Sequence, residues 1–143
     1  MPSAENKAVV RRYFEEVIDG GKLDVLDELA ARECLVHRPE ARDAIRGIAA
    51  FKQAVGKILA VYSEFHTIIH DMVAEDDKVV CRLTHKCIHA TDWTSRAGTH
   101  AVAGKPVSWQ AIAIFRLREG KIAEEWVCRD ELGMLIQLGM LGR

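Results

Sequence analysis

The hydrophobic positions of the first 60 residues recur at helical spacing. Apolar side chains stand three and four apart over residues 9–18, and this stretch ends at Gly20-Gly21. A shorter stretch of the same kind covers residues 23–30, and a third follows Gly47 and runs to Tyr62. The pattern predicts three amphipathic helices. Residues 35–37, ahead of Arg38-Pro39, predict a brief strand between the second and third helices.

From residue 65 onward the hydrophobic period becomes alternating. Residues 65–73 predict a strand with two partly apolar faces, and residues 75–77 predict the turn that follows it. Over residues 79–89 the odd positions carry valine, leucine, cysteine or histidine, so we expect them to face the core. Residues 90–105 are mostly small and polar, which favours an irregular loop that covers a cavity. Residues 131–141 predict a short apolar helix or turn.

The last two strands are predicted as a hairpin that turns at Glu119-Gly120. A two-residue turn at this point pairs Arg118 with Lys121. The same register, continued along both strands, gathers the apolar side chains on one face. These are Trp109, Ala111, Ala113, Phe115, Leu117, Ile122, Trp126 and Cys128.

Two carboxylates share this predicted face. The register sets Asp130 opposite Trp109 and Glu124 opposite Phe115. A carboxylate among aromatic and small apolar side chains is poorly solvated when ionised, so its pKa should rise toward the range useful for proton transfer. Asp130 is therefore the first catalytic candidate.

Helices followed by antiparallel strands predict an α+β fold, in which N-terminal helices pack in the concave face of a curved, mostly antiparallel sheet. A chain of 143 residues suits one domain, 1–143, that is large enough to enclose a small-molecule pocket. The opposite face of the sheet would carry Ile68, Met72, Ile112 and Ile114, which suits a sheet-to-sheet homodimer.

The composition argues against nucleic-acid and membrane partners and favours a function carried out in a local pocket. The 20 basic and 21 acidic residues nearly cancel and form no block of one sign, which argues against a nucleic-acid partner. No apolar stretch is long enough to span a bilayer, so we expect no membrane association and a cytoplasmic protein. The scattered cysteines form no CxxC pair, which suits reduced core thiols; they are Cys34, Cys81, Cys87 and Cys128.

Several strings along nearly the whole chain resemble the SnoaL-like polyketide cyclases, also called ester cyclases, of the nuclear transport factor two-like fold. The most specific string is Glu-Trp-x-x-x-Asp over residues 125–130, followed by Leu-Gly-x-Leu-x-Gln-Leu-Gly over residues 132–139. Shorter matches lie at residues 36–39, 76–80, 82–89, 104–107 and 120–122. The resemblance implies a cone-shaped α+β domain.

The resemblance also implies a chemistry. In characterised members an aspartate at the position of Asp130 acts as general acid/base in an intramolecular aldol ring closure, without metal or cofactor. His37 falls at a recurrent histidine position of the family. Many members carry Gly-Thr before the histidine that falls at His89, whereas this chain has Cys87-Ile88 there, a departure at the expected rim of the pocket.

Cofactor-free ring closure needs a base and a donor for the enolate oxygen. Asp130 would be the base, and His37, His89, Trp109 or Trp126 would supply the donor. The alternative for Asp130 is a helix cap that accepts a backbone N–H bond from Leu132 or Gly133, which would lower its pKa.

Aromatic side chains are expected to form the pocket wall and to stack on a planar ligand. The predicted wall consists of Trp109, Trp126, Tyr13 and Phe115, with Cys128 as a small apolar filler. His85-x-Cys87-x-His89 would present three potential metal ligands on one strand face, but no further ligand with suitable spacing is evident. We expect neither a metal nor a cofactor.

The favoured interpretation is an enzyme, a cyclase-like lyase or isomerase that acts on a small hydrophobic carbonyl compound. A non-catalytic ligand-binding or assembly domain is the main alternative, and an open cavity would argue against pure assembly. A limonene-type epoxide hydrolase would need an Asp-Arg-Asp relay around a water molecule. It is disfavoured because Arg82 and Arg116 are predicted to lie on the other face of the sheet from Asp130. A ketosteroid-isomerase-like site would need Tyr13 and a second carboxylate, for which Glu124 is the candidate.

Overall fold

The computed structural model describes residues 2–95 and 98–139. Helix α1 (Pro2–Arg12) continues directly into the π-helical segment η1 (Tyr13–Asp19). The 3-10 turn η2 (Leu23–Val25) leads into α2 (Leu26–Leu29), and α3 spans Ile48–Val61. These segments confirm the three helices that the hydrophobic spacing predicts.

Six strands form the main sheet of the described residues, in the order β2-β1-β8-β7-β4-β3. Neighbouring strands are antiparallel except β1 and β8, which run parallel, so the sheet is mostly antiparallel as predicted. The strands are β1 (Ala30–His37), β2 (Ile45–Arg46), β3 (Tyr62–Glu75), β4 (Lys78–His89), β7 (Pro106–Arg118) and β8 (Lys121–Arg129).

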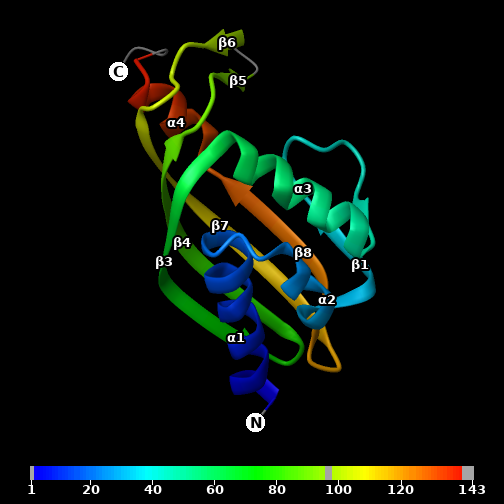
Figure 1. Cartoon of the computed structure of the whole chain (residues 1–143). Coiled ribbons are helices and arrows are strands. Elements are labelled where there is room, and N and C mark those ends of the chain that lie inside the picture. Colours follow the sequence, from blue (N-terminus) through cyan, green and yellow to red (C-terminus); the bar gives the residue numbers. More distant parts are fainter. Residues whose placement is uncertain (1, 96–97, 140–143) are drawn as a thin grey trace.

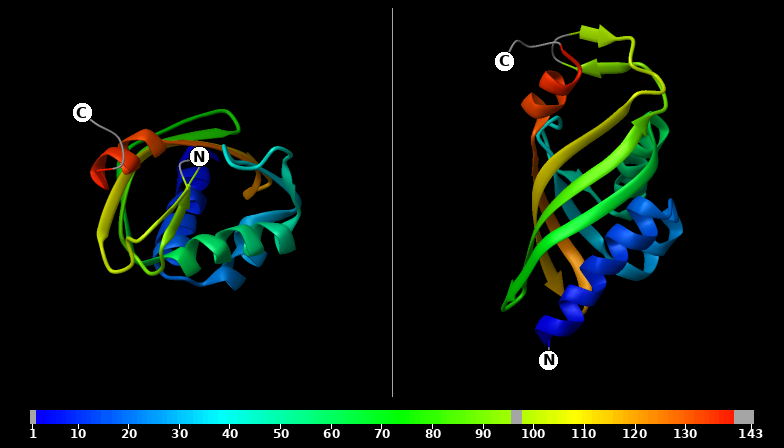
Figure 2. Two further views of the ribbon diagram at one scale, coloured as in Figure 1. Left: turned by 90° about the horizontal axis from the view of Figure 1, so that it is seen from above. Right: turned by 90° about the vertical axis from the view of Figure 1, so that its left-hand side faces the viewer.

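The sheet twists and curves, and the three N-terminal helices lie on its concave side (Figures 1 and 2). Val10, Tyr13 and Val17 of the first helical segment are buried in one cluster with Leu83 of β4 and Phe115 of β7. Full burial of each such side chain stabilises the fold by roughly 1.5–3 kcal/mol. The predicted α+β architecture is confirmed.

The segment between β4 and β7 differs from the predicted irregular loop. Residues Trp93–Ser95 (β5) and Gly98–His100 (β6) pair as a small antiparallel hairpin. The hairpin lies at the end of the molecule that also carries α4 (Glu131–Gln137), far from the start of α1 (Figure 1). Trp93 is buried and packs against His89 and His100, which anchors β5. Residues 140 and 141 of the predicted last helix lie outside the described residues.

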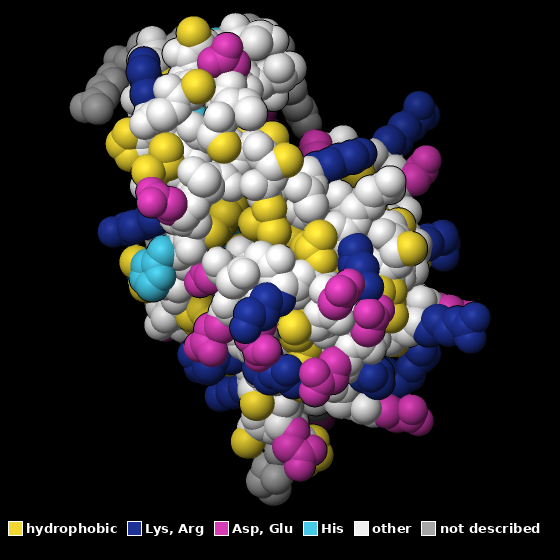
Figure 3. Space-filling model, viewed as in Figure 1, with side chains coloured by type: hydrophobic (Ala, Val, Ile, Leu, Met, Phe, Trp, Pro, Cys, Tyr) yellow, Lys and Arg dark blue, Asp and Glu magenta, His cyan; other side chains and the backbone are white. Residues whose placement is uncertain are grey.

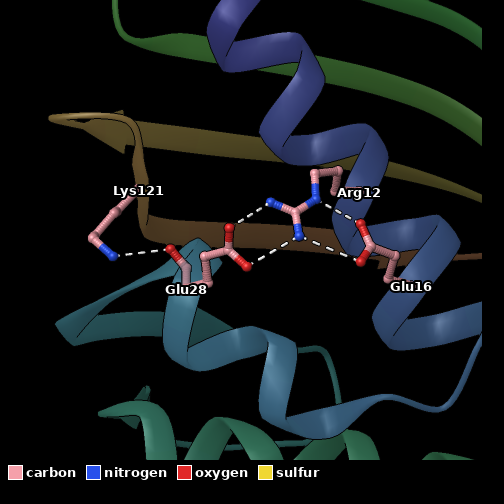
Figure 4. Close-up of polar contacts among 4 residues, drawn as sticks. All are labelled: Arg12, Glu16, Glu28 and Lys121. Carbon is pink, nitrogen blue, oxygen red and sulfur yellow. Dashed lines mark hydrogen bonds and ion pairs between the residues drawn. The ribbon is translucent and has the colours of Figure 1, made fainter.

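A charged cluster ties the first helical segment to α2 and to the start of β8 (Figure 4). The Arg12 guanidinium donates to Glu16 at 2.6 Å and to Glu28 at 2.9 Å, and Lys121 Nζ donates to the Glu28 carbonyl oxygen at 2.9 Å. Because Arg12 is partly exposed and Glu28 is exposed, this cluster orients the elements more than it stabilises them.

The predicted register of the last hairpin is correct only next to its turn. Arg118 pairs with Lys121 and Leu117 with Ile122, but Arg116 then pairs with Glu124. Ala123 is the extra residue of a β-bulge, and every later side chain of β8 lies on the face opposite to the predicted one.

Two bulges also interrupt β3, between Ser63 and His66 and between Ile69 and Asp71. The second reverses the alternation, so Met72 packs against the core and Val73 is 61% exposed. The expectation that Met72 lies on the outer sheet face is therefore wrong, whereas Ile112, 53% exposed, does lie there.

The surface view shows basic and acidic side chains intermingled over the helices, with hydrophobic side chains visible between them (Figure 3). No helix among the described residues is long and apolar enough to cross a membrane. Cys34, Cys81 and Cys87 are buried free thiols, as predicted, but Cys128 is exposed.

Candidate functional site

A cavity of about 780 Å³ lies between the concave face of the sheet and α3. Its walls are mostly apolar. Side chains of β3, β4 and β7 line one side, chiefly Tyr62, Phe65, Leu83, Trp109, Ala111 and Ala113, and the α3 residues Ala50, Ala54, Ile58 and Val61 line the other. This volume suits a drug-sized or smaller ligand. The interior is therefore not filled, which argues against a purely assembly-type domain.

Three polar side chains meet at the wall of this cavity. Arg38 Nη2 donates to Oε1 of Glu125 at 3.2 Å and lies 3.5 Å from the Tyr13 hydroxyl oxygen. The carboxylate comes from β8, the guanidinium from the residue after β1, and the phenol from the first turn of η1. All three line the cavity, so a ligand would meet a charged pair inside an apolar enclosure.

Burial controls the protonation of this cluster. Glu125 is 2% exposed, and this burial raises the pKa of its carboxyl group against the opposing attraction of Arg38. Burial also raises the pKa of the Tyr13 hydroxyl, helped by the charge of Glu125. Burial acts to lower the pKa of Arg38, but the attraction of Glu125 outweighs it and the guanidinium stays charged. The cluster can therefore donate hydrogen bonds and hold negative charge on a ligand.

His85 faces the same cavity from β4. Its ring contacts Phe14, Phe65 and Trp109, with centroid distances of 6.1, 5.4 and 5.5 Å. Burial, with further contributions from Arg38 and Arg129, lowers the pKa of His85 to about 4. The imidazole is therefore neutral at pH 7 and keeps a lone pair that can accept a proton.

The predicted placement of Asp130 on the apolar face is wrong. The Ala123 bulge shifts the register of β8, so the buried carboxylate that lines the cavity is Glu125. Asp130 is exposed at the start of α4, where its Oδ1 accepts the Gly133 backbone N–H at 2.8 Å. This is the capping arrangement considered as the alternative.

The predicted donors and wall residues divide between the two faces of the sheet. Trp109 and Tyr13 line the cavity as expected. His37 and Trp126 do not line the cavity. Their rings stack on each other with centroids 5.4 Å apart, and Nε2 of His37 lies 2.6 Å from Glu124. The same register shift explains the exposed position of Cys128.

Phe115 and His89 are buried but do not line the cavity. Phe115 packs beneath it against Tyr13 and Phe14. His89 packs against Tyr62 and Trp93, and neither ring nitrogen has a hydrogen-bond partner within residues 2–95 and 98–139. Burial lowers the pKa of His89, which matches a neutral ring.

The sequence interpretation missed Glu125, Arg38 and His85. Glu125 carried a weak signal, because the adjacent apolar pair Ile122-Ala123 breaks strand alternation and is compatible with a bulge. His85 lay on the predicted inward face of its strand but was weighed only as a metal ligand. Arg38 stood out in the sequence only as part of the short family-like string at residues 36–39. Within the described residues, no three His, Cys, Asp or Glu side chains are arranged to hold a metal ion.

Comparisons with known proteins agree with this architecture. The family model described as SnoaL-like polyketide cyclase matches residues 8–138. No curated protein matches the chain. TsrD from Streptomyces laurentii has a similar structure, with a TM-score of 0.80 and 24% identity over 96% of this chain and 97% of that one.

Two further solved structures share the fold. A candidate polyketide cyclase from Acidithiobacillus ferrooxidans gives a TM-score of 0.84 at 19% identity over 96% of each chain. A SnoaL-like polyketide cyclase from Agrobacterium tumefaciens gives a TM-score of 0.77 at 16% identity over 94% of this chain and 98% of that one. The match of the family model along nearly the whole chain means that this protein belongs to the SnoaL-like polyketide cyclase family.

Proposed function

We propose that this protein is a cofactor-free acid/base enzyme, a lyase or isomerase of the cyclase type, that acts on a small hydrophobic carbonyl compound. The observation that carries the proposal is the buried Glu125–Arg38 pair beside Tyr13 in an apolar cavity of about 780 Å³. An aromatic or polyketide-like ligand fits the aromatic wall that Trp109 contributes. The family of the chain is consistent with this class of ligand.

The chemistry that this site supports is enolisation. Removal of a proton next to a carbonyl group places negative charge on the carbonyl oxygen. The Arg38 guanidinium can donate a hydrogen bond to that oxygen, and burial raises the pKa of Glu125 in the direction that favours proton delivery from its carboxyl group to an alkoxide that forms later. The mostly apolar walls of the cavity strengthen these interactions. Enolisation followed by carbon–carbon bond formation is an aldol-type ring closure.

The test is the exchange of α-protons for deuterium in 1-tetralone, 2-octanone and ethyl levulinate, followed by mass spectrometry. We expect the wild-type protein to accelerate exchange in at least one ketone and Glu125→Gln to reduce that acceleration by about 100-fold or more. Glu124→Gln is the matched control, because Glu124 is the adjacent carboxylate of β8 and contacts His37 and Arg116.

Two results would contradict the proposal. Equal exchange by the wild-type protein and Glu125→Gln would remove Glu125 from the chemistry. Ketone binding in a calorimeter without any accelerated exchange would identify a ligand-binding domain instead of an enzyme. Circular dichroism of each variant separates a loss of chemistry from a loss of fold.

We also propose that two copies associate through their outer sheet faces. Ile112 is 53% exposed there, and Ile68 and Ile114 extend the apolar surface. A two-fold axis would set this surface against its own copy. Sedimentation velocity of the wild-type protein should give a dimer, and Ile112→Glu should give a monomer. A wild-type monomer at micromolar concentration would contradict the proposal.

A further inference from the structure

A chain of hydrogen bonds runs from Asp19 through Thr67 to His85. The Thr67 hydroxyl donates to Oδ1 of Asp19 at 2.7 Å, and the Thr67 backbone N–H donates to Oδ2 at 2.9 Å. Nδ1 of His85 lies 2.8 Å from the same hydroxyl oxygen. Asp19 ends η1, and Thr67 and His85 are paired across β3 and β4. Three separate elements therefore hold the imidazole.

The geometry of this chain selects one tautomer of His85. An ionised carboxylate only accepts hydrogen bonds, and a hydroxyl group has one proton to give. Because the Thr67 proton points at Asp19, the Thr67 oxygen can only accept from His85. Nδ1 must then carry the ring proton, and Nε2 must carry the lone pair.

Nε2 is the ring atom left for a ligand. The ring lines the cavity, and no described residue makes a hydrogen bond to Nε2. In the described part of the chain, the fully buried side-chain nitrogen and oxygen atoms without a hydrogen-bond partner belong to Arg38 and His89. Nε2 of His85 has no partner either but is not among these buried atoms, so it is accessible from the cavity. The flanking rings of Phe65 and Trp109 restrict rotation of the imidazole.

Burial keeps the His85 ring neutral, and nearby cationic groups reinforce this effect. Arg38 acts from the residue after β1 and Arg129 from the end of β8, and both disfavour a second positive charge beside them. Asp19 acts from η1 through Thr67, and no other carboxylate hydrogen-bonds this chain among the described residues. A neutral imidazole with a fixed tautomer is the form that a general base requires.

We propose that His85 is the base that removes the α-proton of the carbonyl ligand, and that Asp19 and Thr67 are its positioning residues. This inference rests on the proposed function. It assigns proton removal to His85 and leaves the carbonyl oxygen to Glu125 and Arg38 in the same cavity. Nε2 takes the proton, the C–H electron pair moves into the enolate double bond, and the carbonyl oxygen takes up the negative charge beside Glu125 and Arg38.

The fate of the proton then depends on the reaction. In the exchange assay the imidazolium loses its proton to solvent, gains a deuteron and returns it to carbon. In a ring closure the enolate carbon bonds to a second carbonyl carbon, and the oxygen of that carbonyl takes up the proton. No oxidant or reductant is needed in either case.

The first test compares exchange rates of 1-tetralone. We expect His85→Gln to reduce kcat for exchange by about 100-fold or more, as for loss of a general base. Thr67→Val should reduce kcat by about 10-fold with little change in KM, the rate equivalent of one lost hydrogen bond, and Thr67→Ser should restore it. Thr84→Val is the matched control, because Thr84 makes a similar contact at 2.7 Å to His70, an exposed histidine.

The second test reads the tautomer directly by nitrogen-15 NMR of the histidine rings, with His85→Gln to assign the signals. We expect protonated Nδ1 and bare Nε2 from pH 7 down to pH 5, and a tautomer mixture in Thr67→Val. A proton on Nε2 at pH 7 would overturn the proposal. So would unchanged exchange in His85→Gln while Glu125→Gln abolishes it, a result that would leave the proposed function intact. No exchange by the wild-type protein would overturn both.

Discussion

Glu125 and Asp130 are carboxylates five residues apart on one segment, yet they meet opposite surroundings. Glu125 is enclosed with Arg38 and Tyr13, so its pKa is raised by burial. Asp130 is exposed and accepts a backbone hydrogen bond from the first turn of α4. The residue type alone therefore says little about its chemistry. The contacts of each carboxylate decide whether burial raises its pKa or its oxygen caps a helix.

The cap predicts the behaviour of Asp130 variants. Asp130→Ala should lower the free energy of unfolding by about 1 kcal/mol, because the Gly133 N–H loses its acceptor. Asp130→Asn keeps an acceptor and should retain both stability and ketone exchange. Urea unfolding and the deuterium assay measure the two quantities. Lost exchange in a stable Asp130→Asn protein would return a catalytic role to Asp130.

The lowered pKa of His85 predicts a pH dependence of stability. The unfolded chain binds a proton at His85 near pH 6.5, whereas the folded chain binds it only near pH 4. Protonation therefore favours unfolding as the pH falls from about 7 to 4, and the wild-type protein should lose roughly 3 kcal/mol relative to His85→Gln over this range. Urea unfolding of both proteins at several pH values measures the difference. Parallel curves would show that the folded protein does not perturb His85.

At the scale of elements, hydrophobic period predicts the helices, the long strands and the turn at Glu119-Gly120. The hydrophobic period does not predict which residues of β8 face the core. Residues 126–128 are Trp-Val-Cys and residues 124–125 are Glu-Glu, so neither run shows an alternation that distinguishes the two faces. The bulge at Ala123 then decides which carboxylate is buried, and the sequence offers only a weak signal for it.

The hairpin turn offers a stability prediction. Glu119 and Gly120 both have positive φ, 53° and 75°, as the favoured two-residue hairpin turn requires. A glutamate is strained in this region, and asparagine tolerates it. Glu119→Asn should raise the free energy of unfolding by about 1 kcal/mol. Glu119→Ala, which keeps a Cβ atom without the asparagine amide, is the control and should give no gain. Equal effects of the two substitutions would contradict this explanation.

At the scale of the whole molecule, the α+β architecture and the presence of a cavity follow from the order of helical and alternating segments. The identity of the polar side chains in that cavity does not. They come from η1, from the end of β1, and from β4 and β8, and their meeting depends on how the sheet curves around the helices (Figure 2). Arg38 illustrates the limit, since only the closed fold brings it within 3.2 Å of Glu125.

The position of the cavity predicts a contrast between two alanines of α3. Ala54 lines the cavity, whereas Ala60 is exposed and does not. Ala54→Leu should fill part of the space and weaken 1-tetralone binding by about 10-fold, since roughly 1.4 kcal/mol of lost contact suffices for that change. Ala60→Leu adds the same side chain to the same helix and should leave binding unchanged. Isothermal titration calorimetry measures both. Equal binding by the two variants would contradict the assigned cavity.

The bulge at Ala123 also bears on how this fold can change its chemistry. Removing the codon of Glu124, with the bulge at Ala123 kept, would flip the faces of the following residues, exposing Glu125 and turning Trp126 and Cys128 inward. Adding or deleting a single residue thus exchanges the entire set of side chains that β8 offers to the cavity. A substitution can alter only one member of that set at a time. An insertion or deletion in this strand is therefore a direct evolutionary route to a new reaction on an unchanged scaffold.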